Sequence, residues 1–142
     1  MGSAAPMIFT AGMAAVQIKQ QSAIGKYNQR VANRNAEIAI QEKGQIDKQA
    51  EFDIARFDQK FRQAEGSVAV AVAKSGAVAG SGTAARIAES NALEAQMERK
   101  ITRYNADMGA AKKIEEAQFS RIQGQIARRE ARIANIQTAA KA

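Results

Sequence analysis

The glycine cluster Gly76–Gly82 is the feature that most constrains the fold of this chain. Long charged stretches lie on either side of it, and the single proline, Pro6, stands near the N-terminus. Glycine readily leaves the helical conformation, while neither arm contains a proline that would interrupt it. The pattern predicts an all-α fold: a long antiparallel helical hairpin with coiled-coil-like packing that assembles into a ring or stacked core.

Four segments follow from this organisation. They are an N-terminal apolar segment at 1–10, a first long helical arm at 11–74, a glycine-rich turn at 75–83, and a second long arm at 84–142 with a basic C-terminal end. The candidate turn residues are Gly76, Gly80 and Gly82.

The run at 67–73 alternates Val with Ala, which is a strand-like period. It therefore either forms an edge strand or continues the first helix. We favour the helix, because Ala is as frequent as Val in this run.

Apolar residues recur at helical spacing in both arms. The first stripe is Ala32, Ala36, Ala39, Ile46, Ala50, Ile54, Phe57, Phe61, Ala64 and Val68. Its small residues come early and its bulky ones late, which predicts close helix approach near 32–39 and wider spacing near 57–61. The second stripe is Ile101, Tyr104, Met108, Ala111, Phe119, Ile122, Ile126, Ile133 and Ile136.

The rhythm of the second stripe is close to seven residues, which predicts left-handed coiled-coil packing interrupted by Glu115 and Arg129. The candidate helix–helix packing residues are Phe57, Phe61, Ile101, Tyr104, Met108, Phe119, Ile122 and Ile126. Asn35 and Asn105 occupy comparable places in the two arms. They either hydrogen-bond across the helix pair and fix its register, or are exposed without a role.

The hydrophobic fraction of 46% is carried largely by alanine, and aromatic residues make up only 5%. Alanine contributes far less burial free energy than Leu or Phe. A lone hairpin of this composition gains little against the entropy of ordering its chain. We therefore expect a homo-oligomer or a component of a larger assembly.

The chain lacks Cys, His and Trp. It therefore has no thiolate, no imidazole ligand and no histidine base, and its carboxylates alternate with cations as on solvated helix surfaces. The glycine cluster does not match a phosphate-binding loop, because Gly82 is followed by Thr83 with no lysine. We expect no enzyme activity, no catalytic residues, no cofactor and no metal site.

The net charge of +7 allows a polyanionic partner, either nucleic acid or a lipid surface. The excess is greatest near the end, where five cations face only Glu130 among the acids after Glu116. The candidate contacts to phosphates or acidic partners are Arg121, Arg128, Arg129 and Arg132. The alternative is that these cations complement a helix C-terminus and keep the chain soluble.

Two weakly charged apolar segments are candidates for membrane contact, Ala4–Ile18 and Gly66–Ala85. Neither is a convincing spanning helix, because the first is short and the second is rich in Gly and Ala. The first also has no Lys or Arg before Lys19, so it does not read as a secretory signal. The competing expectation is burial against a partner.

Several short runs together carry a family resemblance: Asn35-Ala36-Glu37, Ala71–Lys74 leading into Ser75-Gly76, Gly80-Ser-Gly-Thr83, Glu89-Ser-Asn-Ala-Leu-Glu-Ala95 and Tyr104-Asn-Ala-Asp107. Over roughly residues 10–120 the chain resembles the small internal virion, or ejection, proteins of short-tailed phages. The resemblance implies packaging inside the capsid on the portal, exit with the genome, and a share in a conduit across the bacterial envelope. It implies portal and other internal virion proteins as partners, with double-stranded DNA and the envelope membrane as further contacts.

Two other functions fit the residues. One is a permanent adaptor or plug subunit of a portal or tail. The other is a basic amphipathic DNA- or membrane-binding protein of cellular origin.

Overall fold

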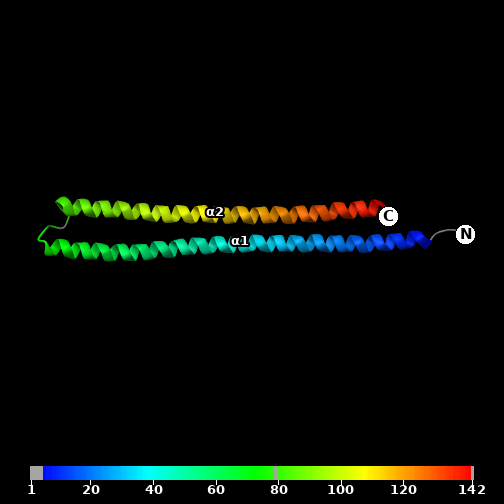
Figure 1. The fold of residues 1–142 in the computed structure, drawn as a ribbon, viewed down its shortest axis with the longest axis horizontal. Coiled ribbons are helices and arrows are strands. Elements are labelled where there is room, and N and C mark those ends of the chain that lie inside the picture. Colours follow the sequence, from blue (N-terminus) through cyan, green and yellow to red (C-terminus); the bar gives the residue numbers. More distant parts are fainter. Residues whose placement is uncertain (1–4, 79, 142) are drawn as a thin grey trace. The chain divides into compact units, whose positions relative to one another are not determined.

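The structure is a computed structural model that describes residues 5–78 and 80–141, and the side chains among them from Gly12 onward. Helix α1 runs from Ala5 to Lys74 and helix α2 from Gly82 to Lys141, with no strand among the described residues (Figure 1). The two helices pack against each other, which confirms the all-α hairpin. The strand interpretation of 67–73 is wrong, because this run is the end of α1. Residues 1–4 of the predicted N-terminal segment lie outside the described residues, and α1 begins within that segment.

The connection between the helices is built on glycines in the left-handed region. Gly76, Gly80 and Gly82 have φ of 73°, 88° and 59°, a conformation that favours glycine; Gly76 and Gly80 lie between the helices and Gly82 is the first residue of α2. At the end of α1, the Ser75 amide donates to the Ala71 carbonyl at 3.0 Å and the Ser75 hydroxyl to the Val72 carbonyl at 2.7 Å. These bonds satisfy carbonyls that the helix terminus leaves without intrahelical partners.

The chain divides into two compact units. Unit 1 comprises Met1–Gln41 and Lys113–Ala142, and unit 2 comprises Glu42–Lys112. Each unit contains a stretch of α1 paired with a stretch of α2. In each, residue numbers rise along one helix as they fall along its neighbour, so both pairs are antiparallel.

Small residues form the seam between the helices of unit 1. Ala36, Ala39 and Ala117 are its buried core cluster. A Cβ added at Gly25 would lie 2.5 Å from the Cβ of Ala131, and one added at Gly124 would lie 2.9 Å from the Cβ of Ala32. The helices therefore approach so closely that these positions admit only hydrogen, which confirms the predicted close approach near 32–39.

In the seam of unit 2, bulky residues of α1 lie against small residues of α2. Phe57 and Phe61 are half-buried and stack with ring centroids 6.2 Å apart, and Ala95 and Ala110 are the buried residues of α2 in this unit. The Arg99 Nε donates to Asp58 Oδ1 at 2.6 Å, and its guanidinium lies 6.0 Å from the Phe61 ring centroid. The predicted stripe on α1 is thus in the seam as far as Phe61, whereas Ala64 and Val68 are exposed.

The predicted packing stripe on α2 does not lie between the two helices. Ile101, Tyr104, Met108, Phe119, Ile122 and Ile126 are 47–63% exposed. As contacts within one hairpin these six predictions are wrong, because α2 carries a second stripe of Ala, Gly, Ser and Thr that allows closer approach to α1. Packing of the six against another chain stays a prediction. Asn35 and Asn105 are also exposed, so neither locks the helix pair.

Candidate polyanion-binding face

The positive charge of the chain is concentrated in unit 1. Its segments contain ten Lys and Arg against four Asp and Glu, a net charge of +6, whereas unit 2 contains eleven against ten, a net charge of +1. All but one of the seven excess charges therefore belong to one helix pair. The sequence alone did not indicate this, because the excess is spread over two segments that are far apart in the chain.

One hydrogen bond between α1 and α2 shows which residues of the two helices lie on the same side of the unit 1 seam. Arg128 Nη1 donates to Gln29 Oε1 at 3.0 Å, so these two residues face each other along one margin of the seam. Lys26 is one helical turn before Gln29 and farther from the seam on that side, because each residue turns the helix by about 100°. Lys19 and Arg30 extend the same row on α1, and all three cations are exposed.

The matching row on α2 consists of Arg121, Arg128 and Arg132, all exposed. It has the same spacing as the row on α1, a step of seven followed by a step of four. Both rows lie on the side of the helix pair that the Gln29–Arg128 bond marks: the row on α2 is within about 40° of Arg128, and the row on α1 is turned about 60–100° past Gln29. We call Lys19, Lys26, Arg30, Arg121, Arg128 and Arg132 the basic face.

Arg129, the fourth predicted contact, is left out of the basic face because it is turned farther around α2 than Arg121, Arg128 and Arg132. It is one residue, or about 100°, past Arg128 and lies in line with Ile126 and Ile133 on the outer side of α2.

Of the four acids of unit 1, Glu37 is exposed and lies seven residues past Arg30, so it ends the row on α1. The acids of α2 lie away from the basic face or are paired. Glu130 is about 200° around α2 from Arg128, and Glu116 accepts a bond from Lys113 Nζ at 2.9 Å.

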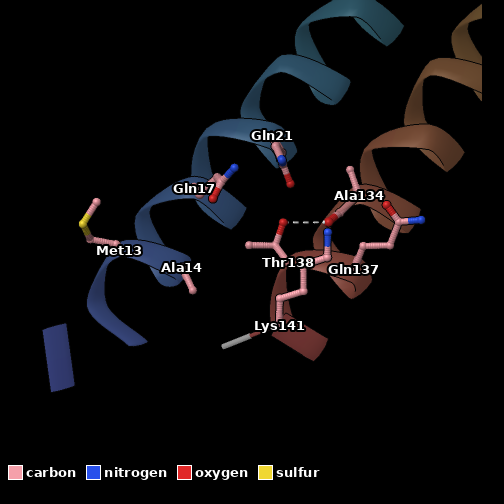
Figure 2. Close-up of a pocket in the computed structure, with 8 residues that line it drawn as sticks. All are labelled: Met13, Ala14, Gln17, Gln21, Ala134, Gln137, Thr138 and Lys141. Atoms are coloured by element: carbon pink, nitrogen blue, oxygen red, sulfur yellow. Dashed lines mark hydrogen bonds between the residues drawn. The ribbon is translucent and has the colours of Figure 1, made fainter. Parts of the chain in front are cut away.

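The opposite broad face of unit 1 carries amides in place of cations. A shallow groove there is lined by Gln17 and Gln21 of α1 and by Ala134, Gln137, Thr138 and Lys141 of α2, with Met13 and Ala14 at its end. Figure 2 shows Gln21 pointing toward Thr138, whose hydroxyl donates to the Ala134 carbonyl at 2.9 Å. The Gln21 Oε1 is a buried acceptor without a hydrogen-bond partner. The groove has one cation, so the two broad faces of unit 1 differ sharply in charge.

Unit 2 has a groove of mixed charge. It is lined by Asp47, Glu51, Asp58 and Asp107 together with Arg103. Two of these acids are paired, Asp47 with Lys43 and Asp58 with Arg99, both at 2.6 Å. Among the described residues, no group of three or more acids is placed to hold a metal ion.

Sequence reasoning found three of the six cations of the basic face and missed Lys19, Lys26 and Arg30. Their spacing, identical to that of Arg121, Arg128 and Arg132, was the available signal. That the two rows share a face follows only from the pairing of the helices.

Comparison of the chain with family models, curated proteins and solved structures gave no match. Within the described residues, neither helix contains a stretch long and apolar enough to cross a membrane.

Proposed function

We propose that the chain is a non-enzymatic internal virion protein of the core or ejection type, which contacts packaged double-stranded DNA through the basic face. In this proposal it is packaged near the portal as a homo-oligomer and leaves with the genome to help form a conduit across the host envelope. The virion assignment rests on the resemblance to phage ejection proteins. The DNA contact rests on the charge distribution.

The observation that carries the DNA contact is the placement of six exposed cations from both helices on one face of unit 1. At 1.5 Å per residue, a row from Lys19 to Arg30 covers about 17 Å. Duplex DNA carries one charge per about 1.7 Å of its axis, so a face of this length meets several phosphates at once. Arginine also contacts phosphate through two parallel hydrogen bonds.

DNA binding tests this contact with a matched pair of variants. The basic-face variant replaces all six cations by Gln, and the control replaces six exposed cations of unit 2, Lys48, Arg56, Lys60, Arg62, Arg86 and Lys100, by Gln. Both lose the same total charge. We expect the affinity for a duplex to fall at least about 100-fold in the first variant and far less in the control.

Salt dependence gives an independent measurement. Each neutralised phosphate contributes about −0.9 to the slope of log K against log salt, so the basic-face variant should lose up to about 5 units of slope. Arg129→Gln, which removes a cation outside the face, should leave the slope nearly unchanged. Equal losses in the basic-face variant and in the unit 2 control would reduce the binding to net charge alone and overturn the assignment to this face.

The virion assignment is tested on particles. Protein content is compared before and after DNA release, since an ejected protein disappears from emptied particles. Retention in emptied particles would favour a permanent portal or tail subunit instead. Absence from intact particles would leave a cellular DNA- or membrane-binding protein.

A further inference from the structure

Each helix of unit 1 carries an outer stripe of large apolar side chains that nothing in the chain covers. The outer stripe of α1 is Met13, Val16, Ile24, Tyr27, Val31 and Ile38, and the outer stripe of α2 is Phe119, Ile122, Ile126, Ile133 and Ile136. All of these side chains are between 42% and 70% exposed. Both stripes advance in steps of three, four or a sum of these, the spacing of a surface that packs against another helix.

The two outer stripes lie on opposite edges of the helix pair. Ile24, Val31 and Ile38 each precede a residue of the seam, Gly25, Ala32 and Ala39, and are turned from it by about 100°. Tyr27, two residues past Gly25, is turned from it by about 160° in the same sense. The stripe therefore centres about 140° from the seam, on the outer part of α1 and on the opposite side from the basic row. Phe119 and Ile126 precede Ser120 and Ala127 in the same way, which places the other stripe on the far side of α2.

The outer stripes also occupy the same level along unit 1. Gly25 lies opposite Ala131, and Ala32 lies opposite Gly124. The part of α1 that carries Ile24 and Val31 is therefore level with the part of α2 that carries Ile126 and Ile133. Two copies placed side by side, without an axial shift, bring the outer stripe of α2 of one copy against the outer stripe of α1 of the next.

We propose that unit 1 associates edge to edge with further copies of this chain through these two outer stripes. The contact is heterologous, because the stripes differ in sequence and lie on different edges, and it repeats until a ring closes or a row ends. In such an assembly, the basic faces of all copies lie on the same side. Stacking of copies by their basic faces would instead bring cations against cations.

The apolar area at each edge supplies a large part of what a specific interface buries. An aromatic side chain buries about 150–250 Å² when fully covered, and each edge presents five or six large side chains that are about half exposed. Each edge thus offers several hundred Å², against about 800 Å² per partner in a standard interface, and every interior copy uses both edges. The buried residues of the unit 1 seam are, by contrast, Ala32, Ala36, Ala39 and Ala117 with Gly25 and Gly124. The outer stripes therefore hold most of the large apolar surface of unit 1.

Two single-edge variants test the contact in the absence of DNA. Tyr27→Asp places a charge in the outer stripe of α1 and leaves the outer stripe of α2 unchanged. Ile126→Asp places a charge in the outer stripe of α2 and leaves that of α1 unchanged. Each variant alone should sediment as a monomer, because every copy lacks one of the two surfaces that must meet. An equimolar mixture should give a heterodimer and nothing larger, because only one pair of intact edges remains. The wild type should form larger species.

The controls separate this result from misfolding. Both positions are exposed and outside the seam, so helical circular dichroism should be retained in both variants. Phe52→Asp, at an exposed position of unit 2, should associate like the wild type. Ile24→Asp with Ile122→Asp forms a second pair that should repeat the pattern.

A cross-linking experiment reports the geometry directly, because the chain has no cysteine of its own. Val31→Cys and Ile126→Cys, mixed and treated with a short bismaleimide, should yield heterodimers in preference to homodimers of either. Dimers of Tyr27→Asp alone would overturn the heterologous contact in favour of an α2–α2 contact. A monomeric wild type that floats with phosphatidylglycerol vesicles would assign the stripes to lipid instead, and a monomeric wild type that ignores vesicles would overturn self-association altogether.

Discussion

In unit 1, α1 turns small side chains toward α2 and large ones outward, whereas in unit 2 the same helix turns large side chains inward. Ala32 and Ala36 are buried in the seam of unit 1 while Tyr27 is exposed. In unit 2, Phe57 and Phe61 lie in the seam. The exposed residues of α1 there are mostly polar or charged, with Phe52, Val68 and Val70 as exposed large apolar residues.

This difference separates two ways of stabilising a helix pair. Unit 2 buries part of its large apolar surface within the chain and adds an ion pair between its helices. Unit 1 uses close backbone approach along an alanine and glycine seam and leaves its large apolar side chains exposed. Unit 1 also holds the charge excess, whereas exposed large apolar side chains, such as Leu93, Met97 and Tyr104 of α2, occur in unit 2 as well.

The largest expected effect comes from forcing the close seam apart. Gly25→Leu places a branched side chain where even a Cβ lies 2.5 Å from the Cβ of Ala131. We expect unit 1 to lose about 3 kcal/mol or more of stability through overpacking. Hydrogen exchange should show lost protection at amides of unit 1 with little change in unit 2. Gly44→Leu is the control, because no atom lies within 4 Å of its added Cβ. Equal protection in both variants would contradict the close seam.

Truncation of a seam aromatic in unit 2 should have the next largest effect. Phe61→Ala removes a half-buried ring that stacks on Phe57 and lies under Arg99. We expect a loss of about 2 kcal/mol, below the range for fully buried rings, measured by urea unfolding. Phe52→Ala, with a ring 63% exposed, should change stability by less than about 0.5 kcal/mol. Similar losses for the two would mean that the seam of unit 2 does not depend on its aromatics.

A double-mutant cycle compares the polar contacts of the two units. Arg99→Met and Asp58→Asn should give a coupling energy of about 0.5–1 kcal/mol that declines with added salt, because both side chains are one-third exposed. The cycle on Arg128 and Gln29 should give a smaller coupling energy, since that bond is exposed and its acceptor is neutral. A coupling energy larger for Arg128 and Gln29 than for Arg99 and Asp58 would contradict this expectation.

The smallest expected effect is a stability change on substitution by alanine that has opposite signs at two glycines. Gly44→Ala should raise stability by about 0.5–1 kcal/mol, the usual gain in an open helix position. Gly25→Ala should instead lower it, because the added methyl meets Ala131. Thermal unfolding of both variants measures this directly. If Gly25→Ala instead raised stability, the seam would accommodate the added methyl group without a loss of folding free energy.

The helices and the turn were predictable from the sequence. Helix formation depends on neighbouring residues, and the glycine cluster with its three positive φ values depends on a few residues in a row. The α1 stripe from Ala32 to Phe61 was also correct, including the close approach near 32–39. The close packing at Gly25 was not predictable, because nothing local in the sequence indicates that Ala131 lies against it.

The tertiary structure decided which face of α2 enters the seam and which cations share a face. Helix α2 has two apolar stripes, one of small side chains and one of large side chains. Periodicity identifies both stripes but does not indicate which of them packs against α1. The small stripe faces α1 because glycine and alanine let the two backbones come close in unit 1. Likewise, Lys26 and Arg128 are about a hundred residues apart in sequence and on one face in space. Periodicity describes each helix alone, whereas pairing depends on the fit between two surfaces, and that fit exists only once the chain has turned back on itself.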